Sequence, residues 1–291
     1  MGALYSWLSG LHEEAANRLL QGTFKEGLVR MTRGTVVVLG AGYTGRRLIA
    51  RLTQTSRPFF ATSRDPDRHL AMLPPSQRLN FDLHRPETWA TIPAQADIVW
   101  CFPAAPVDLV RACAEVLKTG TGRMVVLGST SAYDTDDTRL YPPPWLDETA
   151  PIDLSQPRVQ GEEYLRNELG AVILRVAGIY GEDRNPLNWI RSGRVGPSRR
   201  FVNLIHVEDL ADICLLALEK GTRGEIYNVS DGTPRTWEQI CLVARERWGV
   251  SSPAETTARE PGKRIDARKL RETLHAPLRH PDLYEALGVL S

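Results

Sequence analysis

Short apolar runs alternate with amphipathic helical patterns through the first two thirds of the chain. This alternation predicts a parallel sheet with helices on both faces. Strands buried on both faces of such a sheet are nearly continuous apolar runs. We therefore expect an α/β fold, a doubly wound parallel sheet of the Rossmann type. The runs that fit this description are 35–39, 59–62, 78–81, 98–102, 124–127, 172–176 and 226–229.

The two ends of the chain depart from this alternation. We expect an N-terminal helical extension at 1–33, a nucleotide-binding domain at 34–180, and a small C-terminal substrate lobe at 181–291. The lobe returns one strand near 225–229 to the sheet, and its pattern predicts a helix at 237–248. Apolar residues of the extension recur at spacings of three and four, as on one face of a helix: Leu4, Trp7, Leu8, Leu11, Ala15, Leu19 and Leu20.

A glycine-rich turn at 40–45 joins the first expected strand to an amphipathic helical segment. In a turn of this kind Gly40 allows the tight bend, Gly42 lets backbone N–H groups approach a pyrophosphate, and Gly45 lets the helix pack on the strand. The helix N-terminus then favours negative charge. With Tyr43 and Thr44 between the glycines, the turn predicts a dinucleotide site.

Composition narrows the partners. The chain carries 36 Lys and Arg against 35 Asp and Glu, so no overall charge directs it to nucleic acid or an anionic membrane. No run approaches the roughly 18 to 20 apolar residues of a membrane span. We expect a small-molecule substrate, a cytoplasmic location and no metal site, because no CxxC pair is found among the four cysteines, Cys101, Cys113, Cys214 and Cys241.

Several further segments, taken in order with the glycine-rich turn, resemble the extended and atypical short-chain dehydrogenases/reductases, the group of NAD-dependent epimerases and dehydratases. The resemblance covers roughly residues 35–287. It implies that Asp82 contacts the adenine, that Pro103 and Ala104 follow the fourth strand beside the cofactor, and that Ser129 hydrogen-bonds a substrate carbonyl. The segments that carry it are 81–83, 97–105, 126–133, 174–181, 203–210 and 227–232.

The chain departs from this family at the proton-transferring pair, a tyrosine followed four residues later by a lysine that lowers its pKa from about 10. None of the eight tyrosines has a lysine four residues on. We favour an alignment that puts Leu154 in the tyrosine position and Arg158 in the lysine position; the other puts Ser155 and Val159 there. Arg158 keeps a positive charge that could contact the nicotinamide ribose, although arginine replaces lysine incompletely.

Two residues near the end of the fifth strand have alternative interpretations. Ser129 is either the hydroxyl that polarises the substrate or a cap at the end of the strand. Tyr133 is a candidate substitute acid, although a tyrosine here is also a structural feature of the family. Asp134 stands where the family usually has glycine, so this turn is altered.

The end of the second strand predicts which nucleotide binds. Ser63 and Arg64 follow its apolar residues, and an arginine there suits the 2′-phosphate of NADP. Asp65 is the rival that would favour NAD, but it precedes Pro66 and is typical of a helix N-cap. We therefore prefer NADP, with NAD as the alternative.

Two features beyond residue 180 could touch a substrate. His206 could titrate near neutrality, but the family's segment is a helix start with Glu208 or Asp209 as its cap. The second feature is a group of arginines that either binds an anionic substrate or forms a solvated basic loop: Arg184, Arg191, Arg194, Arg199 and Arg200.

We predict an NAD(P)-binding oxidoreductase, or an epimerase/dehydratase, for a small carbonyl, alcohol or sugar-nucleotide-like substrate. The alternative is an inactive NAD(P)-binding regulatory or assembly protein, and a homodimer is one option for either.

Overall fold

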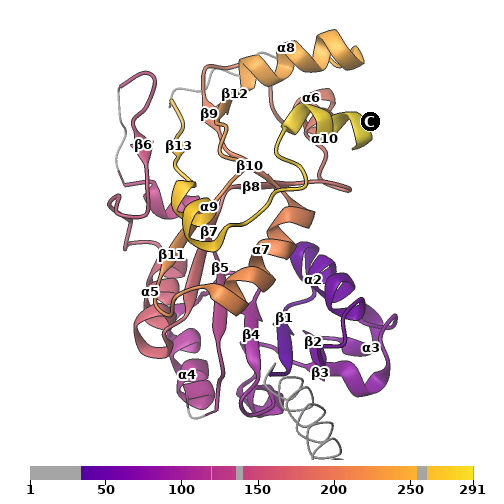
Figure 1. Ribbon diagram of the computed structural model, residues 1–291, viewed down its shortest axis with the longest axis vertical. Coiled ribbons are helices and arrows are strands. Elements are labelled where there is room, and N and C mark those ends of the chain that lie inside the picture. The colour runs from indigo at the N-terminus through magenta and orange to yellow at the C-terminus, as the bar shows by residue number, and fades with distance from the viewer. Residues whose placement is uncertain (1–33, 119, 136–139, 254–260, 291) are drawn as a thin grey trace, which may run out of the picture.

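The computed structural model describes residues 34–118, 120–135, 140–253 and 261–290 (Figure 1). The helix expected within residues 1–33 lies outside this part of the chain. Within the described residues, no helix is long and apolar enough to cross a membrane.

The central element is a seven-stranded sheet, parallel throughout, with strand order β11-β7-β5-β4-β1-β2-β3. Each of the seven predicted apolar runs supplies one strand, so the predicted doubly wound sheet is confirmed. The order reverses beside β1, which places a ligand crevice at the carboxyl ends of β1 and its neighbours. The strands are β1 (Val36–Leu39), β2 (Phe59–Ser63), β3 (Arg78–Asn80), β4 (Asp97–Trp100), β5 (Met124–Ser129), β7 (Val172–Val176) and β11 (Ile226–Val229).

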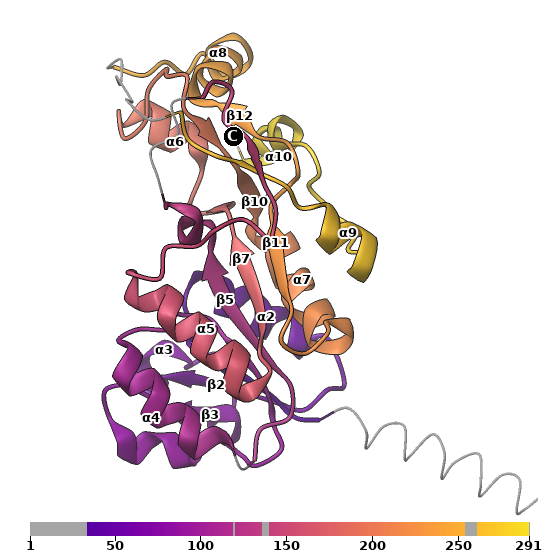
Figure 2. The same ribbon diagram turned by 90° about the vertical axis from the view of Figure 1, so that its left-hand side faces the viewer.

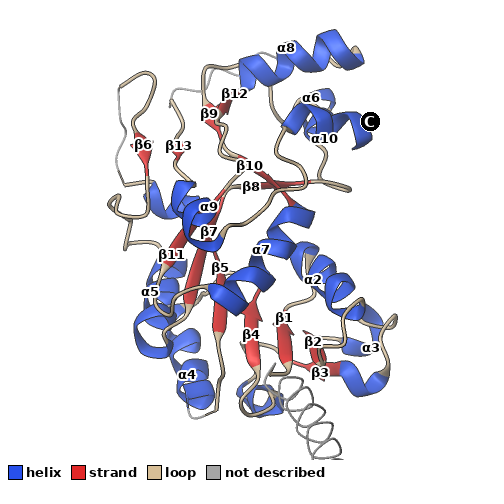
Figure 3. Cartoon of the chain, viewed as in Figure 1, coloured by secondary structure: helices blue, strands red, loops and turns tan. Residues whose placement is uncertain are grey.

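Helices cover both faces of the sheet, as Figures 2 and 3 show. Helices α2 (Tyr43–Thr53) and α7 (Val207–Lys220) pack together on one face, and α4 (Val107–Lys118) and α5 (Pro157–Leu169) pack together on the other. Alternate residues of β1 serve the two cores: Val36 and Val38 face α2 and α7, while Val37 and Leu39 face α4. Short helical turns complete this part: α3 (Pro66–His69), η1 (Pro75–Gln77), η2 (Pro86–Thr91) and η3 (Thr130–Tyr133).

A smaller group of elements from the part of the chain after residue 177 stands above the carboxyl ends of the strands (Figure 1). It has an apolar core of its own, which includes Tyr180, Ile190, Ile240 and Leu287. Helix α8 (Trp237–Trp248) has the predicted bounds and begins with a capping box. Its other elements are β8 (Gly178–Tyr180), α6 (Pro186–Arg191), β9 (Phe201–Val202), β10 (Leu204–His206), β12 (Arg235–Thr236) and α10 (Leu283–Leu290).

The remaining pieces connect this lobe to the sheet. Strand β13 (Arg264–Ile265) pairs in parallel with β6 (Trp145–Leu146) in the long connection after β5. Helix α9 (Arg268–Leu274) packs near β11 and α7. The polar connection after β5 is thus held against a segment that is more than 100 residues away in the chain.

Candidate functional site

A cavity of about 510 Å³ opens at the carboxyl ends of β1 and β2 and beside the turn after β4. It lies at the position that the reversal of strand order predicts for a ligand. Its lining residues are Gly40, Ala41, Gly42, Arg46, Thr62, Ser63, Arg64, His69, Phe81, Asp82, Leu83, His84, Phe102, Pro103 and Ala105.

The glycine-rich turn forms one wall of the cavity, and its three glycines differ in what they require. Gly40 has φ +93°, a conformation that L side chains rarely adopt. A Cβ atom on Gly45 would lie 2.2 Å from the carbonyl oxygen of Gly40, so packing demands glycine there. A Cβ atom on Gly42 would meet nothing within 4 Å among the described residues. The glycine at 42 is therefore free of packing demands, and the space beside it is open to a ligand.

The predicted cofactor residues divide into two groups. Gly40, Gly42, Ser63, Arg64, Asp82 and Pro103 line the cavity, whereas Tyr43, Thr44, Gly45 and Ala104 are not among its lining residues. Thr44, Gly45 and Ala104 are buried. Ala104 packs on α5, where a Cβ atom on Gly161 would lie 1.9 Å from its carbonyl oxygen.

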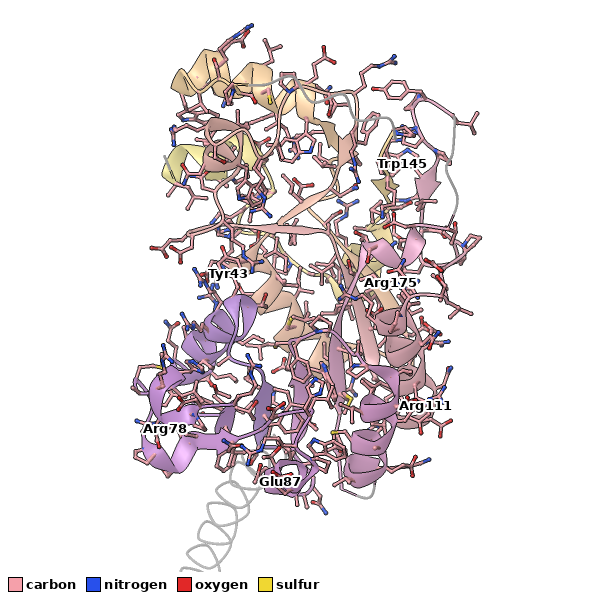
Figure 4. The ribbon with its side chains drawn as sticks, turned by 180° about the vertical axis from the view of Figure 1, so that it is seen from behind. Tyr43, Arg78, Glu87, Arg111, Trp145 and Arg175 are labelled. Carbon is pink, nitrogen blue, oxygen red and sulfur yellow. The ribbon has the colours of Figure 1, made fainter. Side chains whose placement is uncertain are left out.

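Tyr43 connects the turn to the C-terminal lobe (labelled in Figure 4). Its hydroxyl donates to the carbonyl oxygen of Glu182 at 2.6 Å. The guanidinium carbons of Arg47 and Arg184 lie 4.4 and 4.2 Å from its ring centroid. Tyr43 therefore fixes the loop after β8 beside the glycine-rich turn.

Nine of the lining residues lie outside the predicted cofactor set, and these include four whose charged, imidazole or aromatic side chains could contact a nucleotide: Arg46, His69, His84 and Phe102. Arg46 could have been found, because it follows Gly45 directly and stands in the first turn of α2. His69 is held beside the cavity by a hydrogen bond with Ser63, in which its Nδ1 atom lies 2.7 Å from the Ser63 hydroxyl oxygen. No motif in the sequence points to either histidine.

Asp65 has the role expected of a helix cap. Its carboxylate accepts a hydrogen bond from the backbone N–H of Arg68, and Pro66 occupies the first position of α3. Asp65 is not among the residues that line the cavity. Asp82 does line it, and its carboxylate accepts from the backbone N–H of His84 at 3.0 Å.

Ser129 ends β5 and caps the short helix η3. Its Oγ atom accepts a hydrogen bond from the backbone N–H of Ser131 at 3.1 Å, and the residue is half-buried. The capping interpretation is thus present in the structure. A serine hydroxyl that accepts in this way still has its own proton to donate to a substrate oxygen.

Tyr133 lies in a buried polar network rather than in the cavity. Its hydroxyl donates to Asn228 Oδ1 at 2.7 Å and accepts from Arg175 Nη1 at 3.2 Å. Burial raises the pKa of Tyr133, and the positive charge of Arg175 opposes that effect. Arg175, labelled in Figure 4, also reaches Glu163 at 3.2 Å.

Arg158 stands in the first turn of α5, where its Nε atom lies 3.3 Å from Glu162 Oε1. Glu162 is 1% exposed, and among the described residues nothing donates to its Oε2 atom. Burial raises the pKa of Glu162 to about 7, against the pull of Arg158 and Arg175. Leu154, four residues before Arg158, is 56% exposed, so a side chain in that position reaches solvent.

His206 is the N-cap of α7, which corrects the expectation that Glu208 or Asp209 caps this helix. Its Nδ1 atom accepts from the backbone N–H of Glu208 at 3.3 Å. A cap must immediately precede the first helical residue, whereas Glu208 and Asp209 lie within the first turn. Burial, and then the stacked His280, lower the pKa of His206 to about 4. The ring is therefore neutral at physiological pH.

The arginines after residue 180 do not share one site. Arg184 stacks on Tyr43, Arg194 lies 5.6 Å from the centroid of the Trp189 ring, and Arg199 lies 3.8 Å from that of Tyr141. Stacking on aromatic rings accounts for three members of this group without an anion.

No protein-family model and no curated protein matches the chain. Solved structures do match over nearly their whole length. A proposed NAD-dependent epimerase/dehydratase from Methylobacillus flagellatus is 25% identical, with a TM-score of 0.72, over 89% of this chain and 98% of the other. A short-chain dehydrogenase/reductase superfamily protein from Agrobacterium tumefaciens with bound NAD is 14% identical, with a TM-score of 0.70, over 87% and 94%. MoeE5 in complex with UDP-glucuronic acid and NAD is 19% identical, with a TM-score of 0.68, over 88% and 96%.

Proposed function

We propose that this chain, which has the fold of the extended short-chain dehydrogenases/reductases, binds NADP and transfers hydride between its nicotinamide and a carbonyl or alcohol carbon. The observation that carries the proposal is the cavity at the ends of β1 and β2, walled by the glycine-rich turn. Two of the three turn glycines are demanded by backbone geometry, and the third, Gly42, leaves open space beside the turn. This arrangement suits a pyrophosphate at the N-terminus of α2.

Two arginines support NADP over NAD. Arg46 and Arg64 line the same cavity from α2 and from the end of β2. Guanidinium groups form strong, often bidentate, hydrogen bonds with phosphate oxygens, so the pair suits a 2′-phosphate. Asp65, the acidic residue that could instead bind the ribose hydroxyls of NAD, caps α3.

In the proposed reaction the bound nucleotide supplies or accepts the hydride, and the residues of the chain orient the substrate. Ser129 donates its hydroxyl proton in a hydrogen bond to the substrate oxygen. Arg158 places positive charge near the nicotinamide ribose. An ordered water or an acid not yet identified supplies the proton, because Tyr133 is committed to Asn228 and Arg175.

An oxidoreductase of this fold would act on a small carbonyl or alcohol compound. An epimerase/dehydratase would act on a sugar-nucleotide-like compound. MoeE5, which shares the fold, binds UDP-glucuronic acid, and this supports the second class. A cytoplasmic location is a further part of the proposal, and a homodimer is one option. An anionic substrate stays an alternative to a solvated basic loop, and the ring contacts of Arg184, Arg194 and Arg199 favour the loop.

The second candidate function is an inactive NAD(P)-binding regulatory or assembly protein. It is favoured by the exposed Leu154 in the tyrosine position and by the buried contacts of Tyr133. Both candidates require nucleotide binding, but only the first requires turnover.

One experiment separates them. Purified wild-type protein and Ser129→Ala are mixed with NADPH and a panel of carbonyl compounds, with nucleotide binding followed by fluorescence and oxidation by absorbance. The proposal expects binding by both proteins and turnover that depends on Ser129. Binding without any turnover favours the inactive protein, turnover that persists in Ser129→Ala rejects the role of Ser129, and no binding rejects both functions.

A further inference from the structure

Residues 261–266, here named the strap, cross from the C-terminal lobe to the connection after β5. The backbone N–H of Phe201 donates to the Pro261 carbonyl at 2.8 Å, and Asn203 holds the strap by two further bonds, from its Nδ2 atom to the Lys263 carbonyl and from the Ile265 N–H to its Oδ1 atom. The strap then pairs with β6 as strand β13. Its backbone is thus fixed on both sides.

Gly262 determines how closely the strap approaches the lobe. Its φ is +76°, and a Cβ atom there would lie 2.1 Å from the carbonyl oxygen of Phe201. Glycine therefore lets the strap lie directly against β9. The next side chain, that of Lys263, points back to the end of β5.

Lys263 binds the turn that follows Ser129. Its Nζ atom donates to the Thr130 carbonyl oxygen at 2.8 Å and forms an ion pair with Asp134. Both partners belong to the turn that Ser129 caps. Asp134, the residue that departs from the family's usual glycine, thereby gains a partner 129 positions away in the chain.

We propose that Lys263 is a positioning residue of the active site: its ammonium group holds the Ser129 turn to the strap and so fixes the Ser129 hydroxyl toward the substrate. The inference rests on the proposed role of Ser129. A chain without the family's tyrosine and lysine relies on fewer groups for orienting the substrate. Small displacements of the Ser129 hydroxyl should therefore lower the reaction rate.

The ion pair itself is a weak source of global stability. The side chains of Lys263 and Asp134 are 21% and 56% exposed, and pairs this accessible to water contribute little. Loss of Lys263 should therefore change the order of one turn rather than the stability of the whole protein. This separates a positioning role from a structural one.

The test compares Lys263→Met with Lys263→Arg, Asp134→Asn and the control Lys269→Met. Lys269 also pairs with a carboxylate, Glu225, and the two side chains are 35% and 44% exposed, but Lys269 stands on α9 and Glu225 directly before β11, so neither belongs to the Ser129 turn. Hydrogen–deuterium exchange of the peptide 129–135, kcat and KM for the carbonyl panel, and the Kd for NADPH are measured for each full-length variant.

Lys263→Met should speed exchange of residues 129–135 about tenfold and lower kcat about 10- to 100-fold, with Kd for NADPH within about threefold of wild type. Lys263→Arg should recover part of both changes, Asp134→Asn should show a smaller version of them, and Lys269→Met should match wild type. If Lys263→Met fails to fold, the comparison rests on Lys263→Arg and Asp134→Asn.

Equal exchange in Lys263→Met and Lys269→Met overturns the proposal, as does faster exchange with an unchanged kcat. If wild-type protein turns over no carbonyl compound, the hydride-transfer function fails. The exchange comparison then still supports or overturns Lys263 as the residue that holds this turn.

Discussion

The glycine-rich turn and the end of β5 lie at the same edge of one sheet, yet their construction differs. The turn is defined by backbone geometry: a positive φ at Gly40 and a close approach at Gly45. The end of β5 depends on side chains from distant segments, with Ser129 in a cap, Tyr133 in a core network and Lys263 arriving on the strap. We therefore expect that substitutions can abolish nucleotide binding and turnover separately in this chain.

We expect the largest effect from a substitution in the glycine-rich turn. Gly45→Val places a branched side chain against the Gly40 carbonyl, so we expect destabilisation of ~3 kcal/mol or more and loss of NADPH binding. Thermal unfolding and fluorescence titration measure the two effects. Gly42→Ala is the matched control, because its Cβ meets no described protein atom.

Gly42→Ala should keep the stability of wild type within about 1 kcal/mol while it weakens NADPH binding. An alanine that weakened folding and binding equally would show that Gly42 serves packing, contrary to the geometry.

The next effect concerns which nucleotide binds in the first region. Arg64→Ala and Arg46→Ala should each raise the Kd for NADPH about 10- to 100-fold, since a charged hydrogen bond contributes about 1.5–3 kcal/mol. Binding of NADH should change little. Arg68→Ala is the control, because Arg68 is not among the lining residues. Equal losses for both nucleotides would contradict an assignment to the 2′-phosphate.

Much of the sheet and of the glycine-rich turn was predictable from the sequence, because patterns of neighbouring residues determine both. The seven apolar runs became the seven strands, and the Asp65-Pro66 pair marked the start of α3. His69 and His84 were not predictable, since short turns rather than a motif bring them to the cavity.

The second region was less predictable for a physical reason. Lys263 meets Asp134 across 129 positions, and no local pattern encodes such a contact. His206 as the cap of α7 was not predictable for another reason: histidine is not a usual cap, and two acidic residues follow it in the first turn of the helix. The sequence leads to Ser129 as a candidate, but no local pattern in it points to Lys263, which contacts the same turn.

The smallest expected effect lies beneath the second region and depends on pH. Burial raises the pKa of Glu162 to about 7 from a usual value of 4.5. A raised pKa in the folded state means that the stability is full below pH 4.5 and declines as the pH rises toward 7. Relative to wild type, Glu162→Gln should therefore gain stability across that interval. Urea unfolding at pH 4.5, 5.5, 6.5 and 7.5 measures it, and parallel profiles would argue that Arg158 and Arg175 keep Glu162 ionised.

The central claim is a nucleotide site that prefers NADP. Its most direct test is fluorescence titration of wild-type protein with NADPH and NADH at the same ionic strength. We predict saturable binding of both, with a Kd for NADPH about tenfold or more below that for NADH, as one charged contact to the 2′-phosphate requires. Tighter binding of NADH would contradict the roles of Arg46 and Arg64, and binding of neither would contradict the site itself.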